Sequence, residues 1–156
     1  IDVTSDYSFT SSLNRNYSYT AGVNHLNGEA ALYFARERYS FSEGDRQRGK
    51  DQMAIITATI QKLTSSKEIL LNYQNIFGEL SDSFQTSVPQ ETLYKLINNQ
   101  ISGGGGWKID NTSVTGSGAS MTTYSIPSAN AYVMIPDEAS VSAAKEKIQA
   151  VLNEGN

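Results

Sequence analysis

The sequence predicts an α/β fold in which helices cover a mixed β-sheet. Strand-like patterns lie at both ends of the chain, at residues 1–23 and 107–135, and helical patterns dominate residues 27–99. Elements ordered in this way pack as a sheet covered by helices and not as a helical bundle. A chain of 156 residues is long enough for one core but short of the size at which cores divide. Residues 1–156 are therefore expected to form a single domain.

The first elements are two short strands and a helix. Apolar residues alternate loosely through residues 1–12, and residues 17–23 are rich in aromatic and β-branched side chains. Asn27 is an expected N-cap, because its side chain can accept a hydrogen bond from a free N–H group in the first turn. The alanines and leucine that follow favour a helix, which should end near Arg36.

A polar loop at residues 40–44 leads into a longer helix, for which Asp45 is the expected N-cap. Apolar residues at helical spacing define one stripe of this helix. They are Met53, Ile56, Ile60 and Leu63. Such a stripe faces the protein core more often than it binds lipid, although an apolar channel beside a phosphate site would suit a polyprenyl phosphate.

Ser66, Val88-Pro89 and Pro136-Asp137 mark the starts of three further helices, and glycine and proline turns separate the remaining strands. The sequence predicts helices at residues 68–84, 90–99 and 136–152, strands at 107–114, 121–126 and 131–135, and a four-glycine loop at 103–106.

Composition excludes several functional classes. The chain has no cysteine and one histidine, His25, which rules out a disulfide framework, a thiolate metal site and a Ser-His-Asp triad within these residues. A net charge of -4 speaks against a general nucleic-acid binder, which needs a basic face. These residues also contain neither an apolar run long enough to span a bilayer nor a signal peptide.

Arginine is unevenly distributed. Four of the five arginines lie between residues 36 and 48, at Arg36, Arg38, Arg46 and Arg48. Guanidinium groups match phosphate oxygens bidentately, so several of them converging on one point would suit a diphosphate. The alternative is a solvated charged surface, because a random cluster of arginines more often lies on the surface than in a phosphate site.

Helix geometry favours a phosphate site. Asp45, Arg48 and Gln52 are spaced i, i+3 and i+7 and share one face of the long helix. Charged groups at the start of a core-facing stripe need partners, and a phosphate there would also meet free N–H groups. The pattern therefore predicts a buried phosphate pocket.

Three polar residues in this region each have two possible roles. Asp45 is either an N-cap or a group that orients the arginines. Gln52 either donates to a phosphate oxygen or is a satisfied core glutamine. Glu37 points away from its arginine neighbours if the segment is extended, which predicts a structural or surface role.

Residues 26–39, LNGEAALYFARERY, followed by Gly44, Asp45, Arg48 and Gln52, closely resemble the second half of the LytR-CpsA-Psr family. The opening residues 1–3 are similar to a strand of that family, and the segment 136–138 resembles streptococcal capsule-locus members. This resemblance implies an α-β-α sandwich on the extracellular face of the Gram-positive cytoplasmic membrane, anchored by an N-terminal helix that these residues lack.

The family resemblance implies a phosphotransferase that moves a glycopolymer, here capsular polysaccharide, from a polyprenyl pyrophosphate carrier to peptidoglycan. Catalytic positions of the family fall on Arg36, Arg38, Asp45 and Arg48. The pyrophosphate would be bound by Arg36, Arg38, Arg48 and Gln52, and no nucleic acid is expected as a partner. Magnesium usually assists the reaction, and arginines would neutralise the phosphoryl oxygens.

The chain departs from the family pattern in two respects. The first half of the family domain, which carries the magnesium-binding aspartates, is missing, so we expect no metal ligands in these residues and an inactive fragment unless that half completes the domain. Many members have an arginine six residues beyond the motif aspartate, where this chain has Asp51 next to Lys50, which places one phosphate contact in doubt.

Two other functions remain open. Relatives have been named transcriptional regulators or attenuators, but an acidic chain without a basic recognition helix argues against direct DNA binding. A chain that keeps the arginines could also bind polyprenyl phosphate without catalysing transfer.

Overall fold

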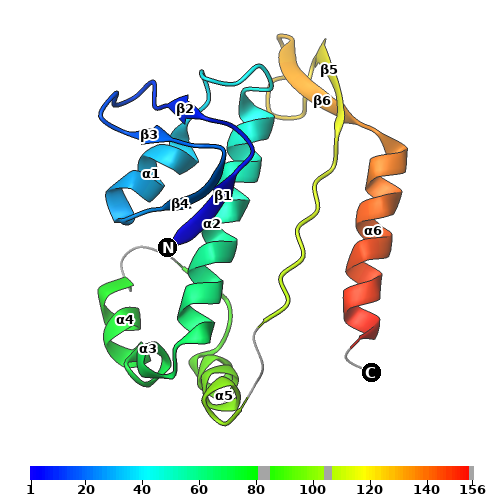
Figure 1. The fold of residues 1–156 in the computed structure, drawn as a ribbon. Coiled ribbons are helices and arrows are strands. Elements are labelled where there is room, and N and C mark those ends of the chain that lie inside the picture. Colours follow the sequence, from blue (N-terminus) through cyan, green and yellow to red (C-terminus); the bar gives the residue numbers. More distant parts are fainter. Residues whose placement is uncertain (81–84, 104–106, 155–156) are drawn as a thin grey trace. The chain divides into compact units, whose positions relative to one another are not determined.

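A computed structural model describes residues 1–80, 85–103 and 107–154. Contacts between Cα atoms divide the chain into two compact units, Ile1–Ile109 and Asp110–Asn156, which Figure 1 shows coloured along the sequence. That residues 1–156 form a single domain stays a prediction. Most of the four-glycine loop lies outside the described residues. In the described part of the chain, no helix is both long and apolar enough to cross a membrane.

Two antiparallel strand pairs open the first unit. β1 (Asp2–Ser5) pairs with β4 (Gly22–His25), and β2 (Phe9–Thr10) pairs with β3 (Ser18–Tyr19). The predicted strand segments are therefore each divided in two. Between β1 and β2 the chain turns where the Ser5 hydroxyl donates to the Tyr7 carbonyl oxygen at 2.7 Å and accepts from its N–H group.

The helix α1 (Gly28–Arg36) completes the core of this unit. Its predicted N-cap is confirmed, because the Asn27 side chain accepts from the N–H group of Ala30 at 2.8 Å. The Phe34 ring is fully buried and lies 5.5 Å from the Phe9 ring and 5.1 Å from the Tyr19 ring. A cluster of aromatic side chains thus joins α1 to the β2–β3 pair.

The long helix α2 (Asp45–Ser65) packs on this core through a different face from the predicted one. Ala58 is buried in the core cluster, with Ala54 and Ile55 packed against it. Met53 and Ile56 are exposed, so the prediction that they face the core is wrong for these two residues. Periodicity identifies an apolar stripe, but two stripes of one helix can compete for the same core.

The N-cap of α2 also differs from the prediction. Gly44 occupies the N-cap position, and no side chain caps the helix. The φ angle of Gly44 is 50°, a conformation that glycine adopts more readily than other residues. Asp45 is the first helical residue, so its carboxylate is free to bond to other side chains.

Three shorter helices follow α2. They are α3 (Lys67–Leu71), α4 (Tyr73–Leu80) and α5 (Gln90–Ile101). The Ser66 start is confirmed, because its hydroxyl accepts from Ile69 N–H at 3.3 Å. One continuous helix at residues 68–84 is wrong: the chain breaks at Asn72, whose carbonyl accepts from Asn75 and Ile76 at the start of α4. The last residues of that prediction, 81–84, lie outside the described residues.

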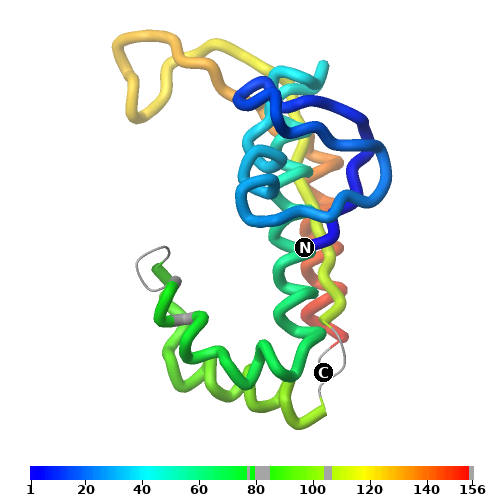
Figure 2. Tube along the Cα trace, turned by 60° about the vertical axis from the view of Figure 1, so that its left-hand side comes forward, coloured from blue at the N-terminus to red at the C-terminus, as the bar shows by residue number. Residues whose placement is uncertain are grey.

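Figure 2 shows how these helices lie within the first unit. The strands and α1 lie beside the first half of α2, in agreement with the α1–α2 and α2–β1 contacts. The second half of α2 leads away from them to α3, which contacts α5. The two halves of α2 therefore have different surroundings.

The second unit is one hairpin followed by a helix. β5 (Gly116–Met121) pairs antiparallel with β6 (Ala131–Pro136), and Asp137 caps α6 (Glu138–Asn153) by accepting from Ser140 N–H at 3.0 Å. The β6 strand and the α6 start are confirmed. The strands predicted at 107–114 and 121–126 are wrong. The strand in this region is β5, which ends at Met121, where the second predicted strand begins.

The sequence missed β5 because glycines weaken its strand propensity. A side chain at Gly118 would lie 2.9 Å from the Tyr132 ring on β6, so the partner strand places an aromatic ring over the glycine. The α/β class is confirmed. Among the described residues the strands form three antiparallel pairs and not one mixed sheet.

Candidate functional site

The arginine residues of the candidate site lie at the junction between α1 and α2. Arg36 is the last residue of α1 and Arg38 follows in the connecting turn, while Arg48 lies in the first turns of α2. Residues that are distant in an extended chain thus come together because the connection between the two helices is short.

Glu37, between two of these arginines, is fully buried. Its carboxylate accepts hydrogen bonds from the backbone N–H and hydroxyl of Ser12 and from the N–H groups of Arg38, Tyr39 and Ser40. Burial raises the pKa of this carboxyl, but the donors from Ser12, Ser40 and Arg38 outweigh it and lower the pKa to about 2. The structural role predicted for Glu37 is confirmed, and a surface location is wrong.

Asp45 brings two arginines together. One carboxylate oxygen, Oδ1, lies 2.7 Å from Nη2 of Arg48 and 3.4 Å from Nε of Arg38. Of the two roles considered for Asp45, the geometry fits the one that orients arginines and contradicts the N-cap. Two guanidinium groups that share one oxygen atom must lie close to each other, so they can act on one anion.

These charges lie on the surface of the described chain. The side chains of Arg38, Arg48 and Asp45 are 46%, 37% and 58% exposed. A pocket that buries them is therefore a wrong prediction for this chain by itself. Exposed guanidinium groups keep their donors accessible, whereas a buried cluster would require a counterion at all times.

Arg36 and Gln52 flank this pair. Arg36 is exposed, and within the described residues its guanidinium has no hydrogen-bonding or ionic partner. Gln52 is also exposed, and its amide donates to the Ala35 carbonyl oxygen at 3.3 Å. The reading of Gln52 as a core glutamine is wrong. The hydrogen bond fixes Gln52 beside the end of α1.

Asp51 does not take part in this cluster. It is 4% exposed on the opposite side of α2, where Oδ1 accepts from the Gln47 amide at 2.9 Å. Burial raises the pKa of Asp51, and the hydrogen bond from Gln47 opposes this only in part. The neighbouring Lys50 pairs with Glu43 at 3.2 Å. Lys50 and Asp51 therefore make no ion pair with Arg38 or Arg48 among the described residues.

An apolar groove lies along the second half of α2. It has a volume of about 320 Å³ and is lined by side chains of α2 to α5, among them Ile60, Leu63, Leu70 and Ile97, and by Trp107, which follows α5. The last two residues of the predicted stripe, Ile60 and Leu63, thus line a groove instead of the core. The α5 residues of this groove were not among the predicted site residues, although Leu93 and Ile97 have the i, i+4 spacing of one helix face.

Among the described residues, no three acidic or imidazole side chains are grouped so that they could hold a metal ion. This observation does not test the prediction that magnesium ligands come mainly from the first half of the family domain. The Asp45 oxygen that faces the arginines is bonded to two cations, which would repel a divalent ion. No chemical step is therefore assigned to a metal held by these residues.

Comparison with known proteins gives one consistent result. The model of the LytR_cpsA_psr family matches residues 1–150. A polyisoprenyl-teichoic acid–peptidoglycan teichoic acid transferase, TagU of Enterococcus faecalis, is 33% identical over 100 residues, covering 64% of this chain and 33% of the relative. TagV of Bacillus subtilis, which has the same descriptive name, is 31% identical over 132 residues, covering 85% and 32%.

A third relative has a different name. Biofilm regulatory protein A of Streptococcus mutans is 31% identical over 78 residues, covering 49% of this chain and 19% of the relative. This chain spans about a third of the length of TagU and TagV.

Solved structures share the fold. The crystal structure of B. subtilis TagV matches with a TM-score of 0.67 and 28% identity, over 98% of this chain and 56% of that one. B. subtilis TagU matches with a TM-score of 0.62 and 23% identity, over 96% and 55%. The second match shows the fold alone.

Proposed function

The chain belongs to the LytR-CpsA-Psr family, and on that premise we propose that it serves in the transfer of a glycopolymer from a polyprenyl pyrophosphate carrier to peptidoglycan. The names of two relatives, both teichoic acid transferases acting on peptidoglycan, support this class of reaction. We propose capsular polysaccharide as the polymer, because segment 136–138 resembles capsule-locus members. The site of action would be the extracellular face of the cytoplasmic membrane.

The observation that carries the proposal is the convergence of Arg38 and Arg48 on one oxygen of Asp45. Asp45 holds the two guanidinium groups side by side without burying them, so their outward donors can bind a pyrophosphate. Arg36 and Gln52 lie at the adjacent end of α1 and would add further contacts. Asp45 acts here as an orienting group for the two arginines.

The proposed reaction is a displacement at phosphorus. An acceptor hydroxyl of peptidoglycan forms a new bond to the phosphorus that carries the polymer, and the bond from that phosphorus to the bridging oxygen breaks. Polyprenyl phosphate leaves with the bridging oxygen, and the hydroxyl proton passes to solvent. Arg36, Arg38 and Arg48 would neutralise the charge that develops on the phosphoryl oxygens and the leaving group. Magnesium assistance is part of the proposal, with ligands mainly from the first half of the family domain.

Reconstitution of the complete natural protein tests the proposal. With magnesium, a labelled polyprenyl-pyrophosphate-linked polymer and peptidoglycan, we expect label to enter peptidoglycan and polyprenyl phosphate to appear. Arg38→Ala should lower the rate at least 100-fold, about 2.7 kcal/mol of transition-state stabilisation. Arg15→Ala is a matched control, because Arg15 is an exposed arginine outside the cluster. Wild-type rates in Arg36→Ala and Arg38→Ala would exclude the site assignment.

A second candidate function is regulation, which the name of the S. mutans relative favours. A non-catalytic role in binding polyprenyl phosphate would also use the arginines. Loss of transfer in the reconstituted system, together with specific DNA binding at physiological salt, would support a regulator. Retention of polyprenyl phosphate by mass spectrometry without turnover would support the binding role.

A further inference from the structure

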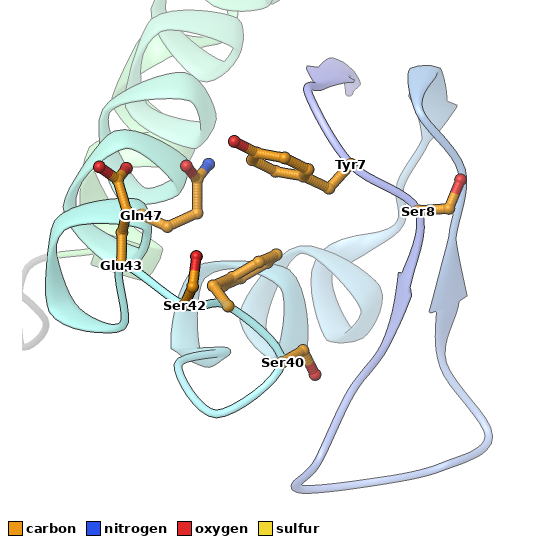
Figure 3. A pocket seen from close by; sticks show the side chains of 7 residues that line it. Tyr7, Ser8, Ser40, Ser42, Glu43 and Gln47 are labelled. Carbon is orange, nitrogen blue, oxygen red and sulfur yellow. The ribbon is translucent and has the colours of Figure 1, made fainter.

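A second, smaller pocket, shown in Figure 3, lies beside the start of α2. Tyr7 from the β1–β2 connection, Ser42 from the turn after α1, and Gln47 from the first turns of α2 line it together with other residues. Successive helical residues are about 100° apart, so Gln47 lies about 200° around the helix from Asp45. The pocket is thus separate from the proposed pyrophosphate site.

One polar group in this pocket is buried without a partner. Gln47 is 2% exposed, and its Nε2 group donates to Asp51, but its Oε1 atom has no hydrogen bond within the described residues. Figure 3 shows its amide lying between Glu43 and the Tyr7 ring. An unsatisfied buried acceptor costs about 1–3 kcal/mol. A ligand that donates a hydrogen bond would remove this cost.

Other lining groups are also available to a ligand. In the described part of the chain, neither the Ser42 hydroxyl nor the Tyr7 hydroxyl makes a hydrogen bond. Glu43 accepts from Lys50 with its Oε2 atom, and its Oε1 atom has no partner among residues 1–80, 85–103 and 107–154. The free groups are thus mainly acceptors and hydroxyls, which bind a ligand rich in O–H donors and disfavour an anion.

Size and shape narrow the ligand further. The pocket volume is about 180 Å³, and a protein cavity of roughly 150 Å³ binds benzene, so one six-membered ring fits. The rings of Tyr7 and Phe41, 5.9 Å apart, form an apolar side of the pocket. We propose that this pocket binds one neutral pyranose sugar through its hydroxyl groups, with the Gln47 Oε1 atom and the Tyr7 and Ser42 hydroxyls as its polar contacts.

The sugar pocket would give the chain a carbohydrate contact that is independent of the phosphate chemistry. A polymer or acceptor glycan would bind there through one of its sugar rings, at a distance from the reacting phosphorus. Binding energy from a non-reacting part of a substrate can be used to orient the reacting part. The inference concerns binding alone, so it can fail or hold whether or not transfer is observed.

Saturation-transfer difference NMR on the complete protein, with methyl β-D-glucopyranoside as the probe, tests the inference. We expect transfer to the sugar ring protons and no competition by a tenfold excess of inorganic phosphate. Ser42→Leu should abolish the signal by filling the pocket, and Tyr7→Phe should weaken it at least threefold. Tyr124→Phe is the matched control, because Tyr124 is a fully exposed tyrosine in the other unit, and it should leave the signal unchanged.

Three outcomes would overturn the inference. The first is no saturation transfer to the glucoside or to methyl N-acetyl-β-D-glucosaminide. The second is an equal signal in wild type and Ser42→Leu, which would place binding elsewhere. The third is displacement of the sugar by phosphate, which would assign the signal to the arginines. Tyr7→Phe removes only the hydroxyl of a half-exposed tyrosine, so it keeps the test valid if Ser42→Leu does not fold.

Discussion

Two buried carboxyl groups, Glu37 and Asp51, have pKa values shifted in opposite directions. Glu37, in the turn after α1, accepts from five N–H and O–H donors. Asp51, in the second turn of α2, accepts from one amide, and its Oδ2 atom has no partner within the described residues. Burial raises the pKa of both groups, yet the pKa of Glu37 is lowered to about 2 while that of Asp51 remains raised.

The difference shows that the number of hydrogen-bond donors decides in which direction the pKa of a buried carboxyl shifts. Glu37 is stable as an anion because its donors replace the lost water. Three of those donors are backbone N–H groups of residues 38–40, so the carboxylate also fixes the backbone that carries Arg38. A buried residue thereby shapes an exposed site.

The largest expected effect is the removal of Glu37. Glu37→Ala leaves several buried or half-buried donors without an acceptor and should lower the free energy of unfolding by about 3 kcal/mol, measured by urea unfolding. Glu91→Ala is a matched control and should leave the midpoint unchanged, because Glu91 is exposed and, among the residues that the structure describes, pairs only with Lys95. A loss of less than about 1 kcal/mol for Glu37→Ala would contradict this reading of its donors.

The second effect is on pH dependence. A carboxyl with a pKa of about 2 in the folded state and 4.5 in its ordinary state stabilises the fold above pH 4.5, and this contribution is lost as the pH falls towards 2. The stability difference between wild type and Glu37→Gln should therefore shrink over this window in urea titrations. Asp51, with a raised pKa, contributes with the opposite sign, since its folded form favours the proton. A constant difference between pH 5 and pH 2 would refute the assignment.

A smaller effect is expected at Asp51. Asp51→Asn removes a poorly solvated charge and adds an N–H donor for the free Oε1 atom of Gln47, so at pH 7 it should raise the free energy of unfolding by up to about 1 kcal/mol. Asp51→Ala should lower it, because both polar groups of the Gln47 amide then lack partners. Destabilisation by Asp51→Asn equal to that of Asp51→Ala would mean that the charge itself is stabilising.

The smallest effect on stability is expected at the exposed carboxylate, Asp45. Its ion pairs with Arg38 and Arg48 are partly solvated, and such pairs contribute roughly 0–1 kcal/mol. Asp45→Asn should shift the urea midpoint slightly in low salt and not at all in 1 M NaCl, where charges are screened within about 3 Å. A shift that persists in high salt would indicate a structural role beyond the ion pairs.

Local signals in the sequence predicted much of the secondary structure. Asn27, Ser66 and Asp137 were assigned as helix starts, and each side chain accepts from an N–H group three residues ahead, which is a distance that sequence alone specifies. Asp45 has the same residue type as Asp137 but does not cap α2, because Arg48, one turn ahead, and Arg38, in the preceding turn, both bind its Oδ1 atom. A local rule fails where a tertiary partner offers a stronger bond.

The sequence predicted which residues form the candidate site, but the predicted burial of these residues was wrong. The arginine density and the spacing of Asp45, Arg48 and Gln52 are properties of the sequence, and the structure brings Arg38 and Arg48 together at Asp45. The expected burial did not follow, since the core-facing side of α2 carries Ala54, Ile55 and Ala58. Gln47 and Asp51 are buried on that same side. Their helical spacing from Ala54 and Ala58 is a signal in the sequence from which their burial could have been predicted.

The sequence by itself determined the family, the α/β class, the helix caps and the local excess of arginine, since all of these depend on residue types at short separations. The tertiary structure decided which face of α2 packs, which buried carboxyl has a lowered pKa and which a raised one, and which polar atoms of the described residues lack a partner. Those properties depend on contacts such as the one between Ser12 and Glu37, 25 residues apart, and on the choice between two apolar stripes of one helix. Spacing along the chain cannot select among such partners, because burial and hydrogen bonding are set by the neighbours that folding brings close.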